Sequence, residues 1–197
     1  NGQEAPDKYK ESLVPLTLAA ARGLTGNALV AFGKSTGEDL GGFVTSLAGA
    51  IAEVSVDLET GKVRVEEMAN WNDSGTVIHP ESFEAQVEGG AVQGIGYVLS
   101  ENYRHDDDTG IPLNTDFYKN KPPSILDYSE RPLKVGAVGA PDPFGPHGAK
   151  GVGEPPYGAA SAAVASAVRD ALGVTFTEFP MSPSAVLEKI ESGEADV

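Results

Sequence analysis

The chain is organised around the stretch Gly148-Ala149-Lys150-Gly151-Val152-Gly153-Glu154-Pro155-Pro156. Its glycines let the backbone lie against a ligand, because no Cβ stands in the way. The two prolines restrict φ and suit the first turn of a helix. The stretch therefore predicts a constrained loop that presents one carboxylate, Glu154. Two interpretations fit these residues: a glycine-rich turn entering a helix, with Glu154 near the helix N-terminus, or a catalytic loop.

The residues on either side of this loop predict regular elements. Residues 133–138 read as a short strand before the loop, and residues 156–172 read as an alanine-rich helix that ends at Gly173. Residues 174–177 are a further strand candidate. A last helix through residue 190 is predicted after Ser182, which is followed by proline as at many helix starts.

Farther upstream the pattern predicts a hairpin and a long helix. Apolar and polar residues alternate in 51–57 and 63–66, and a turn containing Gly61 separates the two runs. From residue 80 to about 103 apolar side chains recur every four residues, which is typical of a helix. Four glycines interrupt that helix, and they indicate either close approach of a neighbour or a break: Gly89, Gly90, Gly94 and Gly96.

The remaining segments read as connections and a separate N-terminal part. Residues 7–23 have loose helical spacing, and a glycine-rich loop follows, so residues 1–45 are expected to form an N-terminal helix and loop. The acidic run at 105–110 lacks the calcium-binding EF-hand pattern and predicts a solvated turn. Residues 112–132 are proline-rich and predict an extended connection. The expected fold class is α+β, a mixed α/β fold, with residues 46–197 as its main structural unit.

Composition limits the classes of function. Hydrophobic residues make up 40% and charged residues 22% of the 197 residues, which is ordinary for a folded protein. The net charge of −15, from 14 basic and 29 acidic residues, disfavours nucleic acid and anionic membranes. The chain has no cysteine, so it carries no disulfide, thiolate nucleophile or cysteine-bound iron–sulfur cluster. No apolar run is long enough to span a bilayer, so a cytoplasmic location is expected.

Several familiar chemistries find no support in the motifs. Lys150 lies between Ala149 and Gly151, which breaks the phosphate-loop pattern, and Pro156 stands where a dinucleotide fingerprint needs its third glycine. The three histidines, at positions 79, 105 and 147, have no metal-binding spacing. No Gly-x-Ser-x-Gly elbow occurs. We expect no metal ligands among the protein side chains.

Two stretches together resemble one enzyme family. The run GAKGVGEPP at residues 148–156 is similar to the active-site loop of the molybdenum hydroxylases, the xanthine dehydrogenase and aldehyde oxidoreductase family. The run QVEGGAVQGIG at residues 86–96 resembles that family's segment whose first glutamine hydrogen-bonds the molybdopterin. Gln86 precedes Glu154 by 68 residues, close to the family's separation. The resemblance extends from about Ser46 to Leu172 and identifies the chain with the C-terminal part of the molybdopterin-binding large subunit.

The resemblance implies specific roles for residues. Glu154 would be the catalytic general base, with water as the source of oxygen. Gln86 would bind the cofactor, together with the loop residues Lys150, Gly151, Val152 and Gly153. The cofactor would be molybdopterin, either alone or as a dinucleotide, and the pterin would hold the molybdenum without protein ligands. Glu-Pro-Pro, where carbon monoxide dehydrogenases tend to have Glu-Ser-Pro, favours an N-heterocycle of purine or nicotinate type, or an aldehyde, as substrate.

The chain also departs from the family. His79-Pro80 and Ala85-Gln86 replace the usual Asn-Pro and Gly-Gln pairs. The family's earlier glycine-glutamine-glycine loops and its iron–sulfur and flavin domains have no counterpart, so partner chains would supply the rest of the molybdenum domain, the iron–sulfur clusters and FAD. The alternative is a non-catalytic structural subunit of a related complex. Retention of both Gln86 and Glu154 argues against it, because packing requires neither residue.

Overall fold

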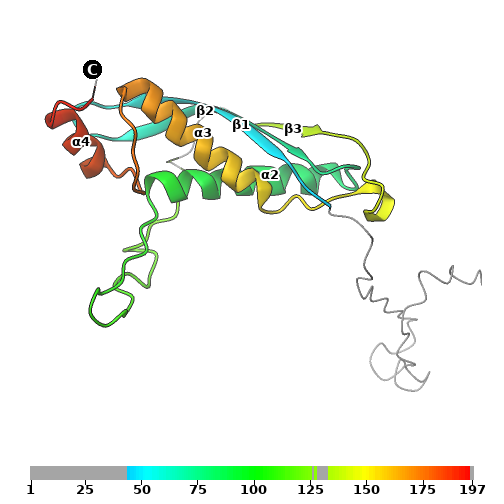
Figure 1. Ribbon diagram of the computed structural model, residues 1–197, viewed down its shortest axis with the longest axis horizontal. Coiled ribbons are helices and arrows are strands. Elements are labelled where there is room, and N and C mark those ends of the chain that lie inside the picture. Colours follow the sequence, from blue (N-terminus) through cyan, green and yellow to red (C-terminus); the bar gives the residue numbers. More distant parts are fainter. Residues whose placement is uncertain (1–43, 126, 128–132, 196–197) are drawn as a thin grey trace, which may run out of the picture. The chain divides into compact units, whose positions relative to one another are not determined.

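A computed structural model describes residues 44–125, 127 and 133–195. These residues confirm the α+β class: three strands form one sheet, and two long helices pack on each other and on the sheet (Figure 1). The N-terminal helix and most of the glycine-rich loop expected within residues 1–45 lie outside the described residues. The division into 1–45 and 46–197 therefore stays a prediction.

The predicted hairpin is confirmed and is longer than its alternating pattern. Strand β1 (Ala48–Val56) pairs antiparallel with β2 (Val63–Asp73). In the turn, Asp57 Oδ1 accepts hydrogen bonds from the backbone N–H groups of Glu59 and Thr60, at 2.9 and 3.0 Å. The turn is thus closed by a side chain that satisfies backbone donors, as is common for aspartate.

Strand β3 (Lys134–Val138) completes the sheet in the order β1-β2-β3. It runs parallel to the second half of β2, where Val138 is the partner of Asp73. The chain that leaves β3 therefore starts beside the end of β2. This pairing delivers the loop before Glu154 to the same end of the sheet.

The two long helices are held together by close backbone approach. Helix α2 (Pro80–Leu99) is continuous, and α3 (Pro155–Leu172) ends at Gly173 with φ of 69°. A Cβ built on Gly94 would lie 2.7 Å from the carbonyl oxygen of Tyr157, whereas one on Gly89 would meet nothing within 4 Å. Gly94 therefore lets α2 approach α3, and the glycines do not break the helix.

His79 starts α2 as its N-cap. Its Nδ1 accepts a hydrogen bond from the backbone N–H of Ser82 at 3.1 Å. The His-Pro pair that departs from the family thus still begins the helix, because the imidazole satisfies an end-of-helix donor that would otherwise lack a partner. None of the described helices has both the length and the apolar character needed to cross a bilayer.

The hydrophobic core lies between the sheet and the helices. Its members are buried apolar side chains from β2, α2, α3, the residue before β3 and the C-terminal segment: Val65, Met68, Ala91, Ile95, Val98, Leu133, Ala160, Val164, Val168, Leu172, Val174, Met181 and Val186. The final helix α4 (Pro183–Glu191) is confirmed, with the Ser182 hydroxyl capping Ala185 N–H. The prediction of a strand at residues 174–177 is wrong, because these residues form no strand in the structure. Val174 and Phe176 pack against the core without pairing to another strand, which explains their alternation.

Candidate functional site

Glu154 is the N-cap residue of α3, immediately before the two prolines. Its backbone is right-handed, with φ of −103° and ψ of −24°, and its side chain makes no capping hydrogen bond. The side chain is exposed. Pro155 and Pro156 at N1 and N2 have no N–H, and the N–H of Tyr157 at N3 donates to the Glu154 carbonyl oxygen at 3.0 Å, so positions N1 to N3 offer no free donor that needs the Glu154 side chain. The carboxylate is therefore available for another role.

The loop before Glu154 offers backbone donors. Within the described part of the chain, no acceptor is hydrogen-bonded to the N–H groups of Gly151, Val152 and Gly153. A Cβ on Gly151 would meet nothing within 4 Å, so this part of the loop is open. Three successive N–H groups without a described acceptor can donate to a ligand that is rich in oxygen or nitrogen acceptors.

Gln86 is brought next to this loop by α2. Its side chain is exposed, and its Oε1 lies 3.5 Å from the position that a Cβ on Gly153 would occupy. One turn farther along α2, a Cβ on Gly90 would lie 3.3 Å from Tyr157 N and 3.5 Å from Gly153 O. The helix and the loop thus meet at small residues, and Gln86 and Gly153, both predicted to bind the cofactor, lie close together.

The predicted residues line two concave regions. Gln86, Lys150 and Val152 contribute to a pocket of about 220 Å³, which is completed by Ser74, Thr76, Val77, Ile78, His79, Ser82, Phe83 and Ala149. Glu154 lines a second pocket of about 410 Å³. Gly153 lies between Val152 and Glu154, so the two regions adjoin the loop on either side of this residue.

Sequence reasoning did not single out the other three residues that line the second pocket, Gln93, Glu101 and Tyr157. Gln93 follows Gln86 by seven residues, two helical turns, so its place on the same face of α2 was a usable signal. Burial raises the pKa of the Tyr157 hydroxyl, and the nearby Tyr97 and Glu101 raise it further. The pocket of Glu154 thus also holds a second carboxylate, an amide and a phenol that stays protonated at neutral pH.

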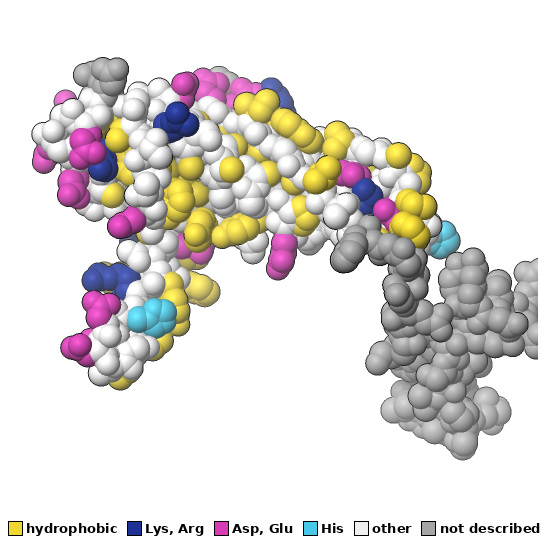
Figure 2. All heavy atoms as spheres, viewed as in Figure 1, with side chains coloured by type: hydrophobic (Ala, Val, Ile, Leu, Met, Phe, Trp, Pro, Cys, Tyr) yellow, Lys and Arg dark blue, Asp and Glu magenta, His cyan; other side chains and the backbone are white. Residues whose placement is uncertain are grey.

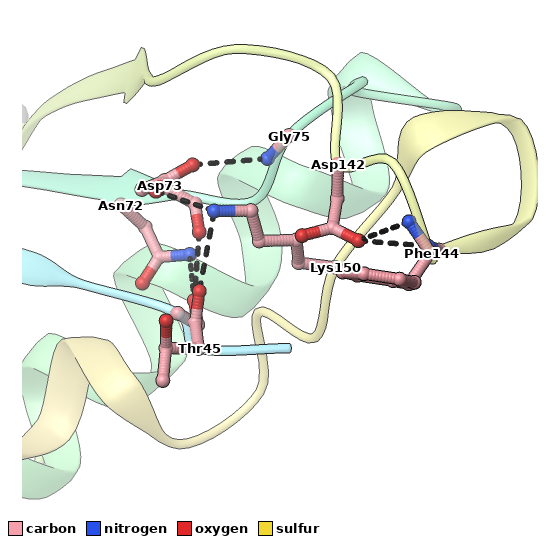
Figure 3. Close-up of polar contacts among 9 residues, drawn as sticks. Thr45, Asn72, Asp73, Gly75, Asp142, Phe144 and Lys150 are labelled. Atoms are coloured by element: carbon pink, nitrogen blue, oxygen red, sulfur yellow. Dashed lines mark hydrogen bonds and ion pairs between the residues drawn. The ribbon is translucent and has the colours of Figure 1, made fainter. Parts of the chain in front are cut away.

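Lys150 ties the loop to the end of β2 (Figure 3). Its Nζ donates to Asp73 Oδ2 at 2.6 Å and to the carbonyl oxygen of Thr45 at 3.2 Å. Its backbone N–H donates to Ser74 O at 2.8 Å, and Gly75 forms a bridge with Ala149. The Lys150 and Asp73 side chains are only 11% and 15% exposed. The Lys150 ammonium is thus used inside the protein, and its predicted contact with a cofactor stays a prediction.

Asp73 was not among the residues that the sequence predicted for the site. The hydrogen bond from Lys150 lowers the pKa of its carboxyl, burial opposes this, and the N–H of Gly75 lowers the pKa further. The second acid near the loop, Asp142, accepts from the N–H groups of Phe144 and Gly145 at 2.8 Å each (Figure 3). Asp142 therefore closes a turn, and Glu154 is the carboxylate that the loop leaves unengaged.

Asp73→Asn should loosen the loop and remove part of the acid sensitivity of folding. A group whose folded pKa is lowered stabilises the fold above its unfolded value, about 3.9, and this stabilisation is lost as pH falls through the folded value. We expect the difference in unfolding free energy between wild type and variant to have its largest value above about pH 5 and to shrink below about pH 4. Thermal unfolding across this range measures it.

Asp57→Asn is the matched control, because the pKa of Asp57 is also lowered, here by N–H groups of the distant hairpin turn. For both variants, the difference in unfolding free energy from wild type should shrink as the pH falls below about 4. Only Asp73→Asn should speed amide hydrogen exchange in residues 148–153. Equal exchange in both variants would mean that the ion pair does not hold the loop.

Within the described ranges, no group of three or more His, Cys, Asp or Glu side chains is placed to hold a metal ion. The polar groups at the loop are instead the backbone N–H groups of residues 151–153, the side-chain amide of Gln86 and the carboxylate of Glu154. These groups suit an organic ligand with many polar atoms better than a bare cation. A cation is bound by oxygen, nitrogen or sulfur atoms with lone pairs, and an N–H group offers none.

Comparison with known proteins finds similarity to molybdopterin-binding proteins. A family model described as a molybdopterin cofactor-binding domain matches residues 9–129. The probable hypoxanthine oxidase of Escherichia coli is 33% identical over 140 residues, which cover 71% of this chain and 14% of the relative. The aldehyde oxidoreductase of Megalodesulfovibrio gigas is 34% identical over 151 residues, covering 76% and 16%. The gamma subunit of the 6-hydroxypseudooxynicotine dehydrogenase complex of Paenarthrobacter nicotinovorans is 34% identical over 143 residues, covering 72% and 18%.

Solved structures show the same similarity. Quinoline 2-oxidoreductase from Pseudomonas putida 86 superposes with a TM-score of 0.64 at 32% identity, over 70% of this chain and 18% of that one. The aldehyde oxidoreductase from Desulfovibrio gigas gives a TM-score of 0.63 at 34% identity, over 71% and 15%. The chain thus spans less than a fifth of these larger chains.

Proposed function

Because the chain belongs to the xanthine dehydrogenase and aldehyde oxidoreductase family of molybdenum hydroxylases, we propose that it carries the general base of a hydroxylation, Glu154. The observation that carries the proposal is the unengaged Glu154 carboxylate, which follows three free backbone N–H groups and adjoins Gln86 through Gly153. The molybdopterin cofactor of the family agrees with the predicted one.

The residues present fit such a cofactor. A pterin with its phosphate carries several ring nitrogens and anionic oxygens, and these need hydrogen-bond donors. The free N–H groups of Gly151, Val152 and Gly153 are donors of this kind, and the Gln86 amide can donate or accept. The open space around Gly151 permits approach of a flat group to the backbone.

When bound, the cofactor supplies the two-electron oxidation of the substrate carbon. Glu154 would accept, on its carboxylate oxygen, the proton of the water-derived hydroxyl group whose oxygen enters the product. A positioned base contributes typically about 10²–10⁴-fold to a rate, provided that its geometry is fixed. The prolines after Glu154 and the Lys150–Asp73 ion pair before it support such fixing. Gln86 would orient the pterin, and Tyr157 would limit access of water to the pocket.

The proposed substrate is an electron-poor carbon of an N-heterocycle or an aldehyde. The names of the relatives support this class, since they include a probable hypoxanthine oxidase, a quinoline oxidoreductase and aldehyde oxidoreductases. We also propose that the iron–sulfur and flavin groups lie on other polypeptides or domains, in agreement with the gamma subunit that is named as part of a complex.

Gln86→Ala tests the cofactor contact. Loss of one hydrogen bond to a buried partner costs roughly 1–3 kcal/mol, so the variant should retain molybdenum about 5- to 150-fold less tightly. Molybdenum and pterin content of the purified, assembled protein is the measurement, and residual turnover should scale with occupancy. Glu84→Ala is the control, because Glu84 is exposed on the same helix two residues earlier.

Two results would count against this part of the proposal. Unchanged occupancy in Gln86→Ala would place Gln86 away from the cofactor. Absence of molybdenum and tungsten from the assembled wild-type protein would favour a non-catalytic subunit that has the fold without the chemistry.

A further inference from the structure

The buried face of β2 changes from apolar to polar along the strand. Met68 packs in the hydrophobic core, and Asn70 and Asn72, the next two residues on the same face, are both fully buried. A buried side-chain amide costs free energy unless its N–H and C=O groups are hydrogen-bonded. What each asparagine contacts therefore indicates why it is there.

Asn70 contacts the first turn of α3. Its Nδ2 donates to the carbonyl oxygen of Pro156 at 3.1 Å, across 86 residues of sequence. Its Oδ1 is buried and has no hydrogen-bond partner among residues 44–125, 127 and 133–195. An apolar side chain would continue the core at this position without leaving a buried acceptor unsatisfied. The bond to Pro156 is thus the contact that distinguishes asparagine here.

The start of α3 benefits from such a contact, because its own residues offer few. Pro155 and Pro156 have no N–H, and the Glu154 side chain makes no capping bond. The charged residues of α3 lie near its C-terminal end, and over this helix Figure 2 shows mainly hydrophobic side chains and uncharged atoms. On the side of α2, a Cβ on Gly90 would lie 3.1 Å from Pro156 Cβ. The first turn is therefore held between α2 and Asn70 of the sheet.

We propose that Asn70 is a positioning residue for Glu154, which rests on the function proposed above. Glu154 stands two residues before Pro156, and its carbonyl oxygen accepts from the N–H of Tyr157 at 3.0 Å, so its backbone belongs to the turn that Asn70 holds. Within the described ranges no hydrogen bond holds the Glu154 carboxylate itself. The position of the turn thus decides where the carboxylate can reach, and a shift of about 1 Å in a reacting group can lower a rate about 100-fold.

Asn70→Leu removes the donor and keeps the branching of the side chain. In the assembled, molybdenum-loaded protein we expect kcat to fall at least about fivefold, because the first turn of α3 loses its bond to the sheet. KM should stay within about twofold of wild type, since Asn70 is buried and contacts Glu154 only through the backbone of α3. Molybdenum content should not change. Thermal unfolding should not become easier, because the change also removes an unsatisfied acceptor.

Asn72→Leu is the matched control. Asn72 is equally buried on the same face of β2, but its Nδ2 donates to Ser46 Oγ at 3.1 Å and not to α3 (Figure 3). Its kcat should remain within about twofold of wild type. An equal loss of kcat in Asn72→Leu and Asn70→Leu would overturn the proposal, because the effect would then belong to the polar face as a whole.

A double-mutant cycle tests whether Asn70 acts through Glu154. Once Glu154→Gln has removed the base, adding Asn70→Leu should lower kcat by less than about twofold more. The same loss in the wild-type and the Glu154→Gln backgrounds would contradict the positioning role, because Asn70 would then act on another group. Asn70→Ala adds no volume to the core and should give the same pattern if leucine disturbs packing.

The cycle also separates the two claims. If Glu154→Gln alone keeps wild-type turnover at full molybdenum content, the proposed function fails and the positioning role fails with it. If Glu154→Gln is impaired while Asn70→Leu and Asn70→Ala keep wild-type kcat, the positioning role alone is overturned.

Discussion

Glu154→Gln is expected to assemble, keep its molybdenum and lose at least about two orders of magnitude in kcat. Glutamine keeps the size and shape of the side chain but cannot accept the proton. The exposed carboxylate makes no capping bond at the start of α3, so the substitution removes no hydrogen bond that the fold requires. Steady-state kinetics corrected for metal content provide the measurement.

Asp142→Asn is the matched control for this experiment. Asp142 lies in the same loop, and its Oδ1 accepts two backbone hydrogen bonds that an asparagine oxygen can also accept. Its turnover should remain within a few-fold of wild type. If Glu154→Gln behaves in the same way with full metal content, Glu154 is not the base. The non-catalytic interpretation would then gain support.

Gly94→Ala should destabilise the protein by forcing a backbone contact between α2 and α3 apart. The added Cβ would lie 2.7 Å from Tyr157 O and 3.0 Å from both Ala160 Cβ and Ser161 N, so α2 and α3 must move apart. Overpacking of this kind costs typically about 1–3 kcal/mol of unfolding free energy. Because α2 carries Gln86 and α3 begins directly after Glu154, the shift should also lower activity.

Gly89→Ala makes the same chemical change in the same helix, where a Cβ meets nothing within 4 Å. Removing an interior glycine should stabilise the helix by roughly 0.5–1 kcal/mol. Denaturant unfolding of the two variants should therefore give changes of opposite sign. Changes of the same sign would contradict the close contact between α2 and α3.

Local pattern predicted most of the described elements. The alternation in β1 and β2, the helical spacing of α2 and the proline and glycine at the ends of α3 each reflect one local rule, and all four elements are present. The exception at residues 174–177 is instructive. Alternating apolar residues indicate burial on one side, and Val174 and Phe176 obtain it from the core without a neighbouring strand.

Long-range pairing could not be predicted in this way. Nothing local in β3 indicates that it runs parallel to β2, and nothing in the sequence near Asp73 points to Lys150, 77 residues away. Gln86 and Glu154 were identified through resemblance to a family. The structure brings Gln86 beside Gly153, whereas Lys150 turns to Asp73. Phe117 and Tyr118 were expected only as part of an extended connection, and no local pattern indicated that both rings would be largely exposed.

The position of molybdenum in the assembled subunit is the most direct test of Glu154 as the base. Anomalous diffraction at the molybdenum absorption edge locates the metal without assumptions about the cofactor. We predict a peak beside residues 151–154 and Gln86, on the side of the loop that the Glu154 carboxylate faces. A peak remote from this loop in catalytically active crystals would contradict the assignment of Glu154 and of the cofactor-binding residues.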